Sequence, residues 1–421
     1  MFLILDTIFY VLIFLIVYIQ VFFLFTFLEN KKNIVRREGN IKLNRYPSVT
    51  ITVPCWNEEK TVSKTIFSLL NLNYPKDKLK IFLVDDGSTD NTWNILKKFE
   101  KSQLNATGST NIRIFQKENG GKYTAINLSL KNTQTEFVGC LDADSSVHPE
   151  ALIRIMSFFE KDIDAMAVVG SMTVDSPKTF VQYAQTIEYQ MSVFFKKMFA
   201  FMGAIHVTPG PFTIFRKKVF DDLGEYVHAH NTEDMEIAYR MQKKFYKIEH
   251  CNDAYIYTNT PPTVEKLFKQ RVRWIYGFIN NTLDYRKILF KKKYGNFSLF
   301  TVPAGIISIF SVSYLFGRIF YNFFDFLFLQ ILKIKTIGFN FSIGASNFDP
   351  FFINTKSFIF IFIFLYILLF FFIILGQKMV EGKWNFSYKL LYFFIVFSFI
   401  SPFWLMKAIY NTAFSRVPSW R

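Results

Sequence analysis

Acidic side chains recur where three short apolar segments end in the first third of the chain. They are Glu58 and Glu59 after VTITV, Asp85 and Asp86 after KIFLV, and Asp142 and Asp144 after EFVGCL. Carboxylate oxygens are the ligands that Mg²⁺ and Mn²⁺ prefer, and these ions usually bridge substrate phosphates. Asp142 and Asp144 alternate beside a strand end, so both can point to the same side. The pattern predicts a site for a divalent cation and a nucleotide.

A single acidic residue of this kind has a simpler explanation. Asp86 precedes Gly87, and Asp–Gly pairs commonly form ordinary turns. The chain carries 49 Lys and Arg against 33 Asp and Glu, a net charge of +16. Three acidic segment ends in so basic a chain are not explained by solubility alone, and together they favour the binding site.

A proton acceptor and two cations lie farther along the chain. Asp234 is in a polar turn, TED, that opens a helix, and a carboxylate positioned there can take the proton of an acceptor hydroxyl. Lys122 and Arg273, together with a metal ion, can stabilise negative charge on a leaving phosphate group. The alternative is that Thr232 or Asp234 simply caps the helix.

The segments around these residues alternate between strands and amphipathic helices. Strands are predicted at 49–53, 80–84, 112–116 and 136–141, and helices at 61–71, 92–100 and 124–131. This order implies an α/β fold with a mostly parallel sheet covered on both faces. Ligands bind beyond the carboxyl ends of the strands in such sheets, so the acidic residues should gather at one edge.

Long apolar stretches flank this soluble part. Residues 7–28 carry no charge and are long enough to cross a hydrocarbon core of roughly 30 Å. Basic residues adjoin both membrane junctions, namely Lys31, Lys32, Arg36 and Arg37 after the first stretch and Lys291, Lys292 and Lys293 before the second. The positive-inside rule places both junctions in the cytoplasm. A cleaved signal peptide is the alternative for the first stretch.

The composition predicts an integral protein of the cell membrane with a cytoplasmic catalytic domain. We expect a transmembrane helix at 1–29, the cytoplasmic domain at 46–296, three or four membrane helices at 297–406 and a basic tail at 407–421. The stretch 297–332 carries Arg318 and Asp325, so one tilted helix and two shorter elements both remain open. The segment FFKKMFAFM at 194–202 suits a helix on the membrane surface beneath the domain.

Several other classes are excluded by composition. Apolar residues make up 51% and charged residues only 19%, which excludes a disordered chain. The three cysteines imply buried thiols rather than a disulfide framework. The basic surplus suits an anionic membrane face, and because the chain has no recognised nucleic-acid-binding module, we expect no nucleic acid partner.

Six motifs occur in the order found in the membrane-bound family 2 glycosyltransferases. They are VTITVPCWNEE, FLVDDGSTDNT, ENGGKYTAIN, CLDAD, NTEDMEIAYRM and QRVRW. The chain resembles this group, which includes hyaluronan, chitin, cellulose and poly-N-acetylglucosamine synthases, over roughly residues 47–274. The resemblance implies a nucleotide-binding domain of the GT-A type.

The resemblance also implies roles for individual residues. Those expected to contact the substrates are Pro54, Trp56, Glu58, Asp85, Asp86, Lys122, Asp142, Gln270 and Trp274. Among them, Asp86 would recognise uracil and Trp274 would form a floor for the acceptor sugar. Asp142 and Asp144 would hold Mg²⁺ or Mn²⁺ on the diphosphate.

The catalytic residues implied by the resemblance are Asp234 as base, Glu233 beside it, and Arg273 on the leaving diphosphate. Gly210 is a further substrate-contact candidate, since a missing Cβ would permit close approach of an acceptor; it could equally be a turn glycine. Core packing is the alternative for Trp274, and a solvated helix face is the alternative for Gln270.

The leading hypothesis is an inverting, metal-dependent glycosyltransferase that elongates a polysaccharide from a UDP-sugar, with or without translocation of the product. The alternative enzyme transfers one sugar to a membrane lipid. A transport or scaffold protein with a degenerate enzyme domain is opposed by the intact acidic and basic motifs. The expected partners are a nucleotide sugar donor, a glycan or lipid acceptor and the bilayer, and the need for a partner subunit is left open.

Overall fold

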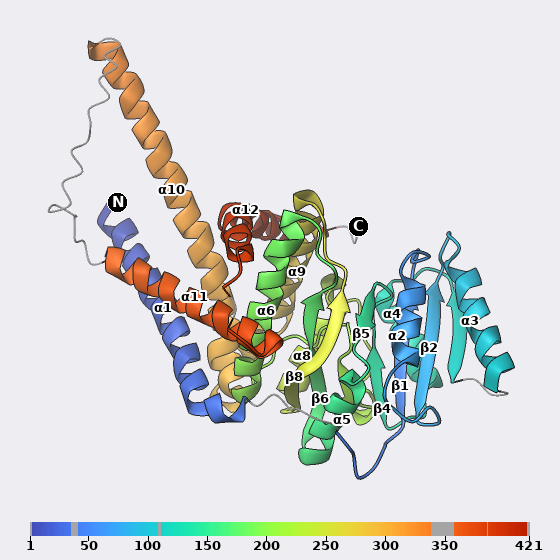
Figure 1. Cartoon of the computed structure of the whole chain (residues 1–421). Coiled ribbons are helices and arrows are strands. Elements are labelled where there is room, and N and C mark those ends of the chain that lie inside the picture. Colours follow the sequence, from blue (N-terminus) through green and yellow to red (C-terminus); the bar gives the residue numbers. More distant parts are fainter. Residues whose placement is uncertain (1, 35–40, 108–110, 338–357, 385, 419–421) are drawn as a thin grey trace.

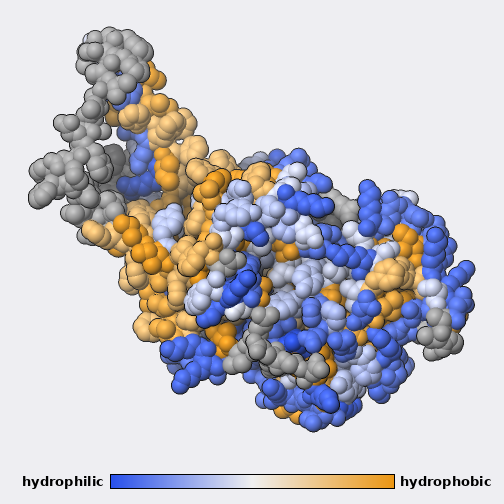
Figure 2. Space-filling model, viewed as in Figure 1, coloured by the Kyte–Doolittle hydropathy of each residue, from blue (hydrophilic) through white to orange (hydrophobic). Residues whose placement is uncertain are grey.

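The computed structural model describes residues 2–34, 41–107, 111–337, 358–384 and 386–418. Arg36, Arg37 and the last three residues of the predicted basic tail lie outside these ranges. A sheet-based domain and a group of long apolar helices occupy opposite ends of the molecule (Figure 1). Apolar residues gather over α1, α10 and α11, whereas polar residues dominate the surface of the sheet domain (Figure 2).

One sheet of eight strands forms the centre of the domain in the described residues. The strands are β1 (Val49–Cys55), β2 (Leu79–Asp86), β3 (Ile112–Lys117), β4 (Phe137–Cys140), β5 (Ser145–Val147), β6 (Ala165–Val174), β7 (Ile214–Arg216) and β8 (Lys247–Thr258). Their order across the sheet is β3-β2-β1-β4-β7-β6-β8-β5.

The sheet is mostly parallel, as the sequence predicts. β1 runs parallel to β2 and β4, β2 to β3, and β6 to β8. The short strand β7 is antiparallel to both β4 and β6, and β5 is antiparallel to β8. β7 therefore joins two parallel groups into one surface, a feature that the strand pattern at the start of the chain does not reveal.

Helices cover both faces of the sheet. They are α2 (Val62–Leu70), α3 (Thr92–Thr107), α4 (Lys122–Asn132), α5 (Ala151–Lys161), α7 (Lys218–Leu223) and α8 (Glu233–Lys243), and α9 (Val264–Asp284) packs against α8. The side chains of β1 point alternately to the two faces of the sheet, and both faces are covered. Val49, Ile51 and Val53 join the main apolar cluster, whereas Thr52 contacts the Ser129 hydroxyl of α4 at 2.5 Å. Both faces of β1 are thus buried, and this buried hydroxyl has a partner.

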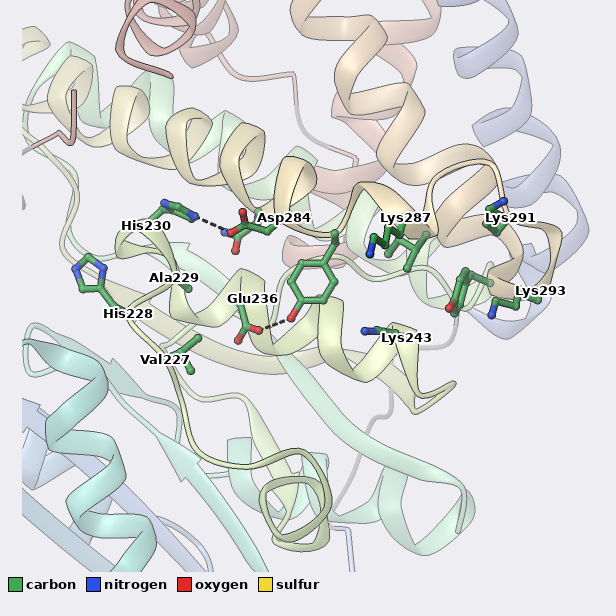
Figure 3. Close-up of a pocket in the computed structure, with 14 residues that line it drawn as sticks. Val227, His228, Ala229, His230, Glu236, Lys243, Asp284, Lys287, Lys291 and Lys293 are labelled. Atoms are coloured by element: carbon green, nitrogen blue, oxygen red, sulfur yellow. Dashed lines mark hydrogen bonds and ion pairs between the residues drawn. The ribbon is translucent and has the colours of Figure 1, made fainter. Parts of the chain in front are cut away.

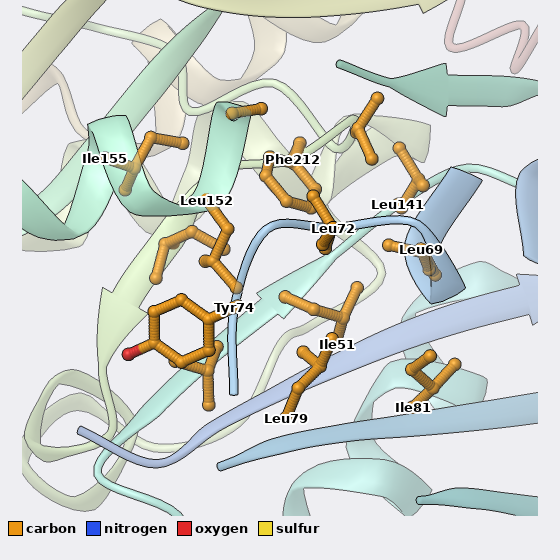
Figure 4. Packing of buried hydrophobic residues seen from close by; sticks show 14 of the residues in the cluster. Ile51, Leu69, Leu72, Tyr74, Leu79, Ile81, Leu141, Leu152, Ile155 and Phe212 are labelled. Atoms are coloured by element: carbon orange, nitrogen blue, oxygen red, sulfur yellow. The ribbon is translucent and has the colours of Figure 1, made fainter. Parts of the chain in front are cut away.

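The main apolar cluster holds α2 and α5 against the sheet (Figure 4). Ile51 and Ile81 from neighbouring strands lie in the same cluster as Leu69 of α2 and Ile155 of α5, and all four are fully buried. Burying side chains of this size contributes about 1.5 to 3 kcal/mol each. The cluster fixes the strand ends from which the acidic loops emerge.

Four helices in the described residues are long and apolar enough to cross a membrane. They are α1 (Phe2–Asn30), α10 (Val302–Ile337), α11 (Phe358–Glu381) and α12 (Lys389–Ala413). For the stretch from residue 297, the sequence allowed either one tilted helix or two shorter elements. The structure has a single helix, α10, preceded by a π-helical turn at Phe297–Thr301. α12 continues through Pro402.

α6 (Phe180–Phe201) connects the sheet domain to the membrane helices. Thr179 and Gln182 form a capping box at its start. Phe194 and Met198 are fully buried, and they share a cluster with Phe372 of α11. The segment 194–202 therefore packs against a candidate membrane helix, and its expected position at the membrane surface remains a prediction.

The contact between α6 and α11 depends on a glycine. A Cβ on Gly376 would overlap the backbone carbonyl of Gln190. A backbone atom cannot rotate away as a side chain can, and overpacking of this kind typically costs about 1 to 3 kcal/mol. We therefore expect Gly376→Ala to lower the thermal unfolding temperature of the detergent-solubilised protein.

Gly317→Ala in α10 is the matched control, because a Cβ there would meet none of the described atoms within 4 Å. If both substitutions leave the unfolding temperature unchanged, the close contact between α6 and α11 is not as described.

Candidate functional site

The loops after β1, β2 and β4 lie at the same edge of the sheet. These strands run parallel, and the pairs Cys55 with Asp85 and Thr52 with Cys140 fix their register. The edge therefore brings together the turn at 56–61, the pair Asp85 and Asp86, and the segment that contains Asp142 and Asp144. The sequence prediction that the acidic residues share one edge is consistent with this geometry.

Lys122 lies at the centre of the site. Its Nζ is 2.5 Å from Asp142 Oδ1 and 3.6 Å from Glu233 Oε1, and only 17% of its side chain is exposed. Burial opposes the charged form of this amine, but the carboxylates of Asp142 and Glu233 outweigh burial and raise the pKa of Lys122 well above its usual value. One ammonium group thus links the β4 edge to the start of α8.

Gly210 lies directly against this ammonium group. A Cβ at position 210 would overlap Lys122 Nζ and lie 3.3 Å from Asp142 Oδ1. The absence of a side chain therefore makes room for Lys122 within the protein itself. The expected approach of an acceptor to Gly210 remains a prediction.

Asp144 is surrounded by like charge. Its Oδ1 accepts a hydrogen bond from Ser145 Oγ at 3.1 Å. Burial raises the pKa of Asp144 to about 7, and the carboxylates of Asp142 and Glu58 add to the effect. A divalent cation next to Asp144 would offset this negative charge, and carboxylate oxygens are ligands that Mg²⁺ and Mn²⁺ prefer.

The carboxylates do not enclose an ion by themselves. Within the described residues, no group of three or more His, Cys, Asp or Glu side chains is close enough to hold a metal. Asp142 and Asp144 would therefore supply only part of a coordination shell. This fits Mg²⁺ or Mn²⁺, since such ions are usually bound through one or two carboxylates, waters and substrate phosphates.

Asp234 and Arg273 complete the charged cluster. The backbone carbonyl of Asp234 accepts hydrogen bonds from the Thr208 N–H at 3.1 Å and the Thr208 hydroxyl at 2.8 Å. Burial raises the pKa of the Asp234 carboxyl to about 6, and Glu233 adds to this, whereas Lys122 and Arg273 oppose it. Burial likewise lowers the pKa of Arg273, against the attraction of Glu233, Asp234 and Asp142.

The helix-cap explanation for Thr232 is not supported by the geometry. Thr232 is the residue before α8, but its side chain makes no capping hydrogen bond in the described structure. Its hydroxyl donates instead to the Ala229 carbonyl at 2.9 Å and accepts from Asn281 Nδ2 at 2.9 Å.

Asp86 and Asp85 shape the loop that precedes Lys122. Asp86 Oδ1 accepts from Lys117 Nζ at 2.5 Å and from the Gly120 N–H at 3.1 Å, and Oδ2 accepts from the Gly121 N–H at 2.9 Å. Asp86 is 3% exposed and Asp85, which accepts from Gln116 Nε2 at 3.2 Å, is fully buried. Recognition of a base by either carboxylate remains a prediction.

The turn after β1 lies beside this loop. Glu58 accepts a hydrogen bond from the Thr61 hydroxyl at 2.6 Å, and its carboxylate is one of the charges that act on Asp144. Trp56 and Pro54 are half-buried in the same segment. These residues lie in the segment for which the sequence predicts a nucleotide contact, and that contact remains a prediction.

The QRVRW segment forms part of α9. Arg271 is ion-paired with Glu188 of α6, and its guanidinium lies 4.1 Å from the centre of the Trp274 ring. Gln270 Oε1 accepts a hydrogen bond from Arg271 Nη1 at 3.0 Å. Gln270 and Trp274 are thus held by Arg271, a residue to which the sequence analysis gave no role.

Two further residues support the site and were also missed. Lys117 ends β3 and pairs with Asp86, so the search for polar residues at strand ends could have found it. Asn281 bonds Thr232 from α9 and is fully buried. Arg273, which donates to the Asn231 carbonyl at 3.2 Å, lies eight positions before Asn281, so both share one helix face.

Comparisons with known proteins bear on this geometry. The family model described as glycosyl transferase family 2 matches residues 50–224. The chain is 29% identical over 254 residues to a poly-beta-1,6-N-acetyl-D-glucosamine synthase of Staphylococcus aureus (strain COL), covering 60% of each protein. It is 32% identical over 231 residues to the enzyme of the same name from Staphylococcus epidermidis, covering 54% of each. The matches thus span at most 60% of these curated relatives.

A solved structure resembles the fold along almost its whole length. It is described as mannosyltransferase PcManGT from Pyrobaculum calidifontis in complex with GDP-Man and Mn²⁺. The match has a TM-score of 0.58 at 14% sequence identity, and covers 96% of this chain and 99% of that one. At this identity the likeness supports the fold alone.

The raised pKa of Asp234 predicts a pH-dependent gain of stability in Asp234→Asn. The pKa is about 6 in the folded protein against 3.8 for an ordinary Asp, so ionisation destabilises the fold. The free-energy cost of ionising Asp234 in the folded protein is fully present at pH values above 6. It becomes smaller as the pH falls below 6. Without divalent cations, we expect the variant to unfold a few degrees above the native protein at pH 8.

This advantage should become smaller at pH 5. Asp77→Asn is the control, since the Asp77 side chain is 74% exposed, and it should show no such pH dependence. A variant that is less stable than the native protein at pH 8 would contradict the described environment of Asp234.

Proposed function

We propose that the protein is an inverting, metal-dependent glycosyltransferase that elongates a membrane-associated polysaccharide from a UDP-sugar, because the glycosyl transferase family 2 model matches residues 50–224. The observation that carries the proposal is the charged cluster around Lys122. Lys122, Asp142, Asp144, Glu233, Asp234 and Arg273 act electrostatically on one another in one largely buried site.

The cluster has the charges that transfer from a nucleoside diphosphate sugar requires. As the bond to the sugar breaks, negative charge grows on the diphosphate, and Lys122 and Arg273 are placed to stabilise it. Asp142 and Asp144 would hold the divalent cation, which supplies further stabilisation of that charge when bound. Because the Lys122 and Arg273 side chains are partly buried, water screens their positive charges less than it would at the surface.

Asp234 would accept the proton from the acceptor hydroxyl. A base works best when its pKa lies near the working pH, and burial brings the pKa of Asp234 to about 6. The acceptor would attack the sugar from the face opposite the diphosphate, so a single displacement would invert the anomeric centre. Trp274, fixed against Arg271, would offer an aromatic face to the acceptor sugar.

Elongation is favoured over a single transfer by the curated relatives. Those described above are named as synthases of a polymer of N-acetyl-D-glucosamine, and their matches cover 60% and 54% of this chain. We therefore infer a UDP-sugar donor, with UDP-N-acetylglucosamine as the first to test. Lys31, Lys32 and Lys291 to Lys293 adjoin the membrane helices and support a cytoplasmic position of the site.

The alternative function is transfer of one sugar to a membrane lipid. It is favoured by the modest membrane portion, which contains four candidate spans in the described residues. The purified protein should be incubated with radiolabelled UDP-sugars and its products separated by size. A ladder of polymers would support elongation. A single lipid-soluble product would contradict elongation and support the transfer of one sugar to a lipid.

Asp234→Asn should abolish sugar transfer while leaving UDP binding intact. Removing a general base typically costs about 10² to 10⁴ in rate. Turnover of the UDP-sugar and the dissociation constant of UDP should be measured on the same preparation, with Asp77→Asn as the control. Full turnover by the Asp234 variant would end its assignment as the base.

Asp144→Asn should weaken the binding of UDP in the presence of Mn²⁺ but not in the presence of EDTA. The reason is that Asp144 would act on the diphosphate only through the cation. Calorimetric titration under both conditions separates the two cases. An equal loss of affinity with and without Mn²⁺, or no loss at all, would count against the metal role.

A further inference from the structure

A cavity of about 890 Å³ lies on the membrane side of the loop that leads to the catalytic carboxylates (Figure 3). Its walls come from residues 227–230, from α8, from the end of α9 and from the segment that leads into the span beginning at Phe297. Neither the sequence motifs nor the proposed function assigns a role to this cavity.

The cavity carries an excess of positive charge. Four lysines line it, namely Lys243, Lys287, Lys291 and Lys293. None of the four forms an ion pair with any described residue. Four ammonium groups that lack an acidic partner among the described residues make this wall attractive to an anion.

The two acidic side chains in the wall do not neutralise these lysines. Glu236 pairs with Arg240 at 2.8 Å and accepts a hydrogen bond from the Tyr285 hydroxyl at 2.5 Å. Asp284 contacts His230 Nε2 at 2.8 Å. Figure 3 shows both contacts on one side of the cavity and the lysines toward the other. The lysine charge is therefore available to a ligand.

The position of the cavity indicates where the anion comes from. Lys291 and Lys293 lie only a few residues before Phe297, where a candidate membrane span begins. The phosphates of phospholipids are found at the level of such a junction, and an anionic membrane surface attracts nearby Lys and Arg side chains. Tyr285 and Tyr294, which also line the cavity, are residue types enriched at this level.

We propose that this cavity binds the phosphate of an anionic membrane lipid headgroup. Free phosphate offers the same chemistry, but it lacks the acyl chains that would hold the headgroup at the start of the span. The binding itself does not depend on the proposed function.

The cavity wall also supports the catalytic loop. Asn281 lines the cavity and donates through Nδ2 to the Thr232 hydroxyl, next to Glu233. The wall residues Ala229 and His230, together with Asn231, have φ angles of 42°, 56° and 62°, a left-handed backbone that is costly outside glycine. A headgroup in the cavity would thus stabilise a strained loop whose next residues are Thr232, Glu233 and Asp234. This consequence rests on the proposed function.

Lipid retention tests the site directly. The full-length protein should be reconstituted in nanodiscs of phosphatidylcholine with 30% phosphatidylglycerol, released, and examined by native mass spectrometry for bound lipid. We expect the native protein to retain phosphatidylglycerol, and the double variant Lys291→Gln/Lys293→Gln to lose at least fivefold of it. Lys31→Gln/Lys32→Gln removes the same charge at the foot of α1, and it should retain phosphatidylglycerol.

Three further measurements decide the result. Lys292→Gln should have no effect, because Lys292 lies between the two lysines but does not line the cavity. Lys291→Arg/Lys293→Arg should retain the lipid, and this separates charge from folding. The proposed site is contradicted if Lys31→Gln/Lys32→Gln loses as much phosphatidylglycerol as Lys291→Gln/Lys293→Gln. It is also contradicted if Lys291→Gln/Lys293→Gln loses none. Displacement of the lipid by millimolar inorganic phosphate would assign the cavity to the free anion and overturn the lipid proposal.

An activity measurement separates the lipid site from the proposed function. Phosphatidylglycerol should raise sugar transfer by the native protein severalfold over phosphatidylcholine alone, and the cavity variant should not respond. If lipid is retained as expected but no UDP-sugar is turned over in any membrane, the proposed function fails and the site stands. If sugar transfer is normal and the cavity retains no lipid, the site fails and the function stands.

Discussion

The ammonium group of Lys122 is the contact on which the rest of the site depends. It lies between Asp142, which follows the central strand β4, and Glu233, which begins α8. Without a cation at this point, carboxylates from two distant parts of the chain would repel one another inside the protein. The same group lies against Gly210, so a third segment is fitted around it. Lys122 thus fixes the spacing of the acidic edge relative to the segment that carries Asp234.

A second constraint connects this site to the membrane. α9 carries Arg273 and Asn281 on one face, and these residues bond the Asn231 carbonyl and the Thr232 hydroxyl just before Glu233 and Asp234. The chain beyond α9 then leads into α10, while α6 joins the sheet to α11 through a close contact at Gly376. The carboxylates are therefore held between a rigid sheet edge and a helix that ends near the bilayer. In such an arrangement, events at the membrane surface can reach the site through a short series of contacts.

The sequence was informative where short-range patterns decide the structure. The strands at the start of the chain and their helices follow from periodicity, and the parallel order places Asp85, Asp142 and Asp144 at one edge. Its limits appear at Asn281, whose partner Thr232 is distant in the chain. At 194–202 the mixture of apolar residues and lysines does not reveal that Lys197 is buried and donates to the His250 carbonyl. Tertiary contacts, rather than local preference, decided these cases.

The central claim is that a single site, built around Lys122, receives the diphosphate of the donor. The most direct test is a cryo-electron microscopy map of the full-length protein with UDP and Mn²⁺ in nanodiscs. The account predicts density for the diphosphate in contact with Lys122 and Arg273, with the metal density beside Asp142 and Asp144. Nucleotide density at any other part of the sheet edge, with the Lys122 cluster unchanged and empty, would contradict it.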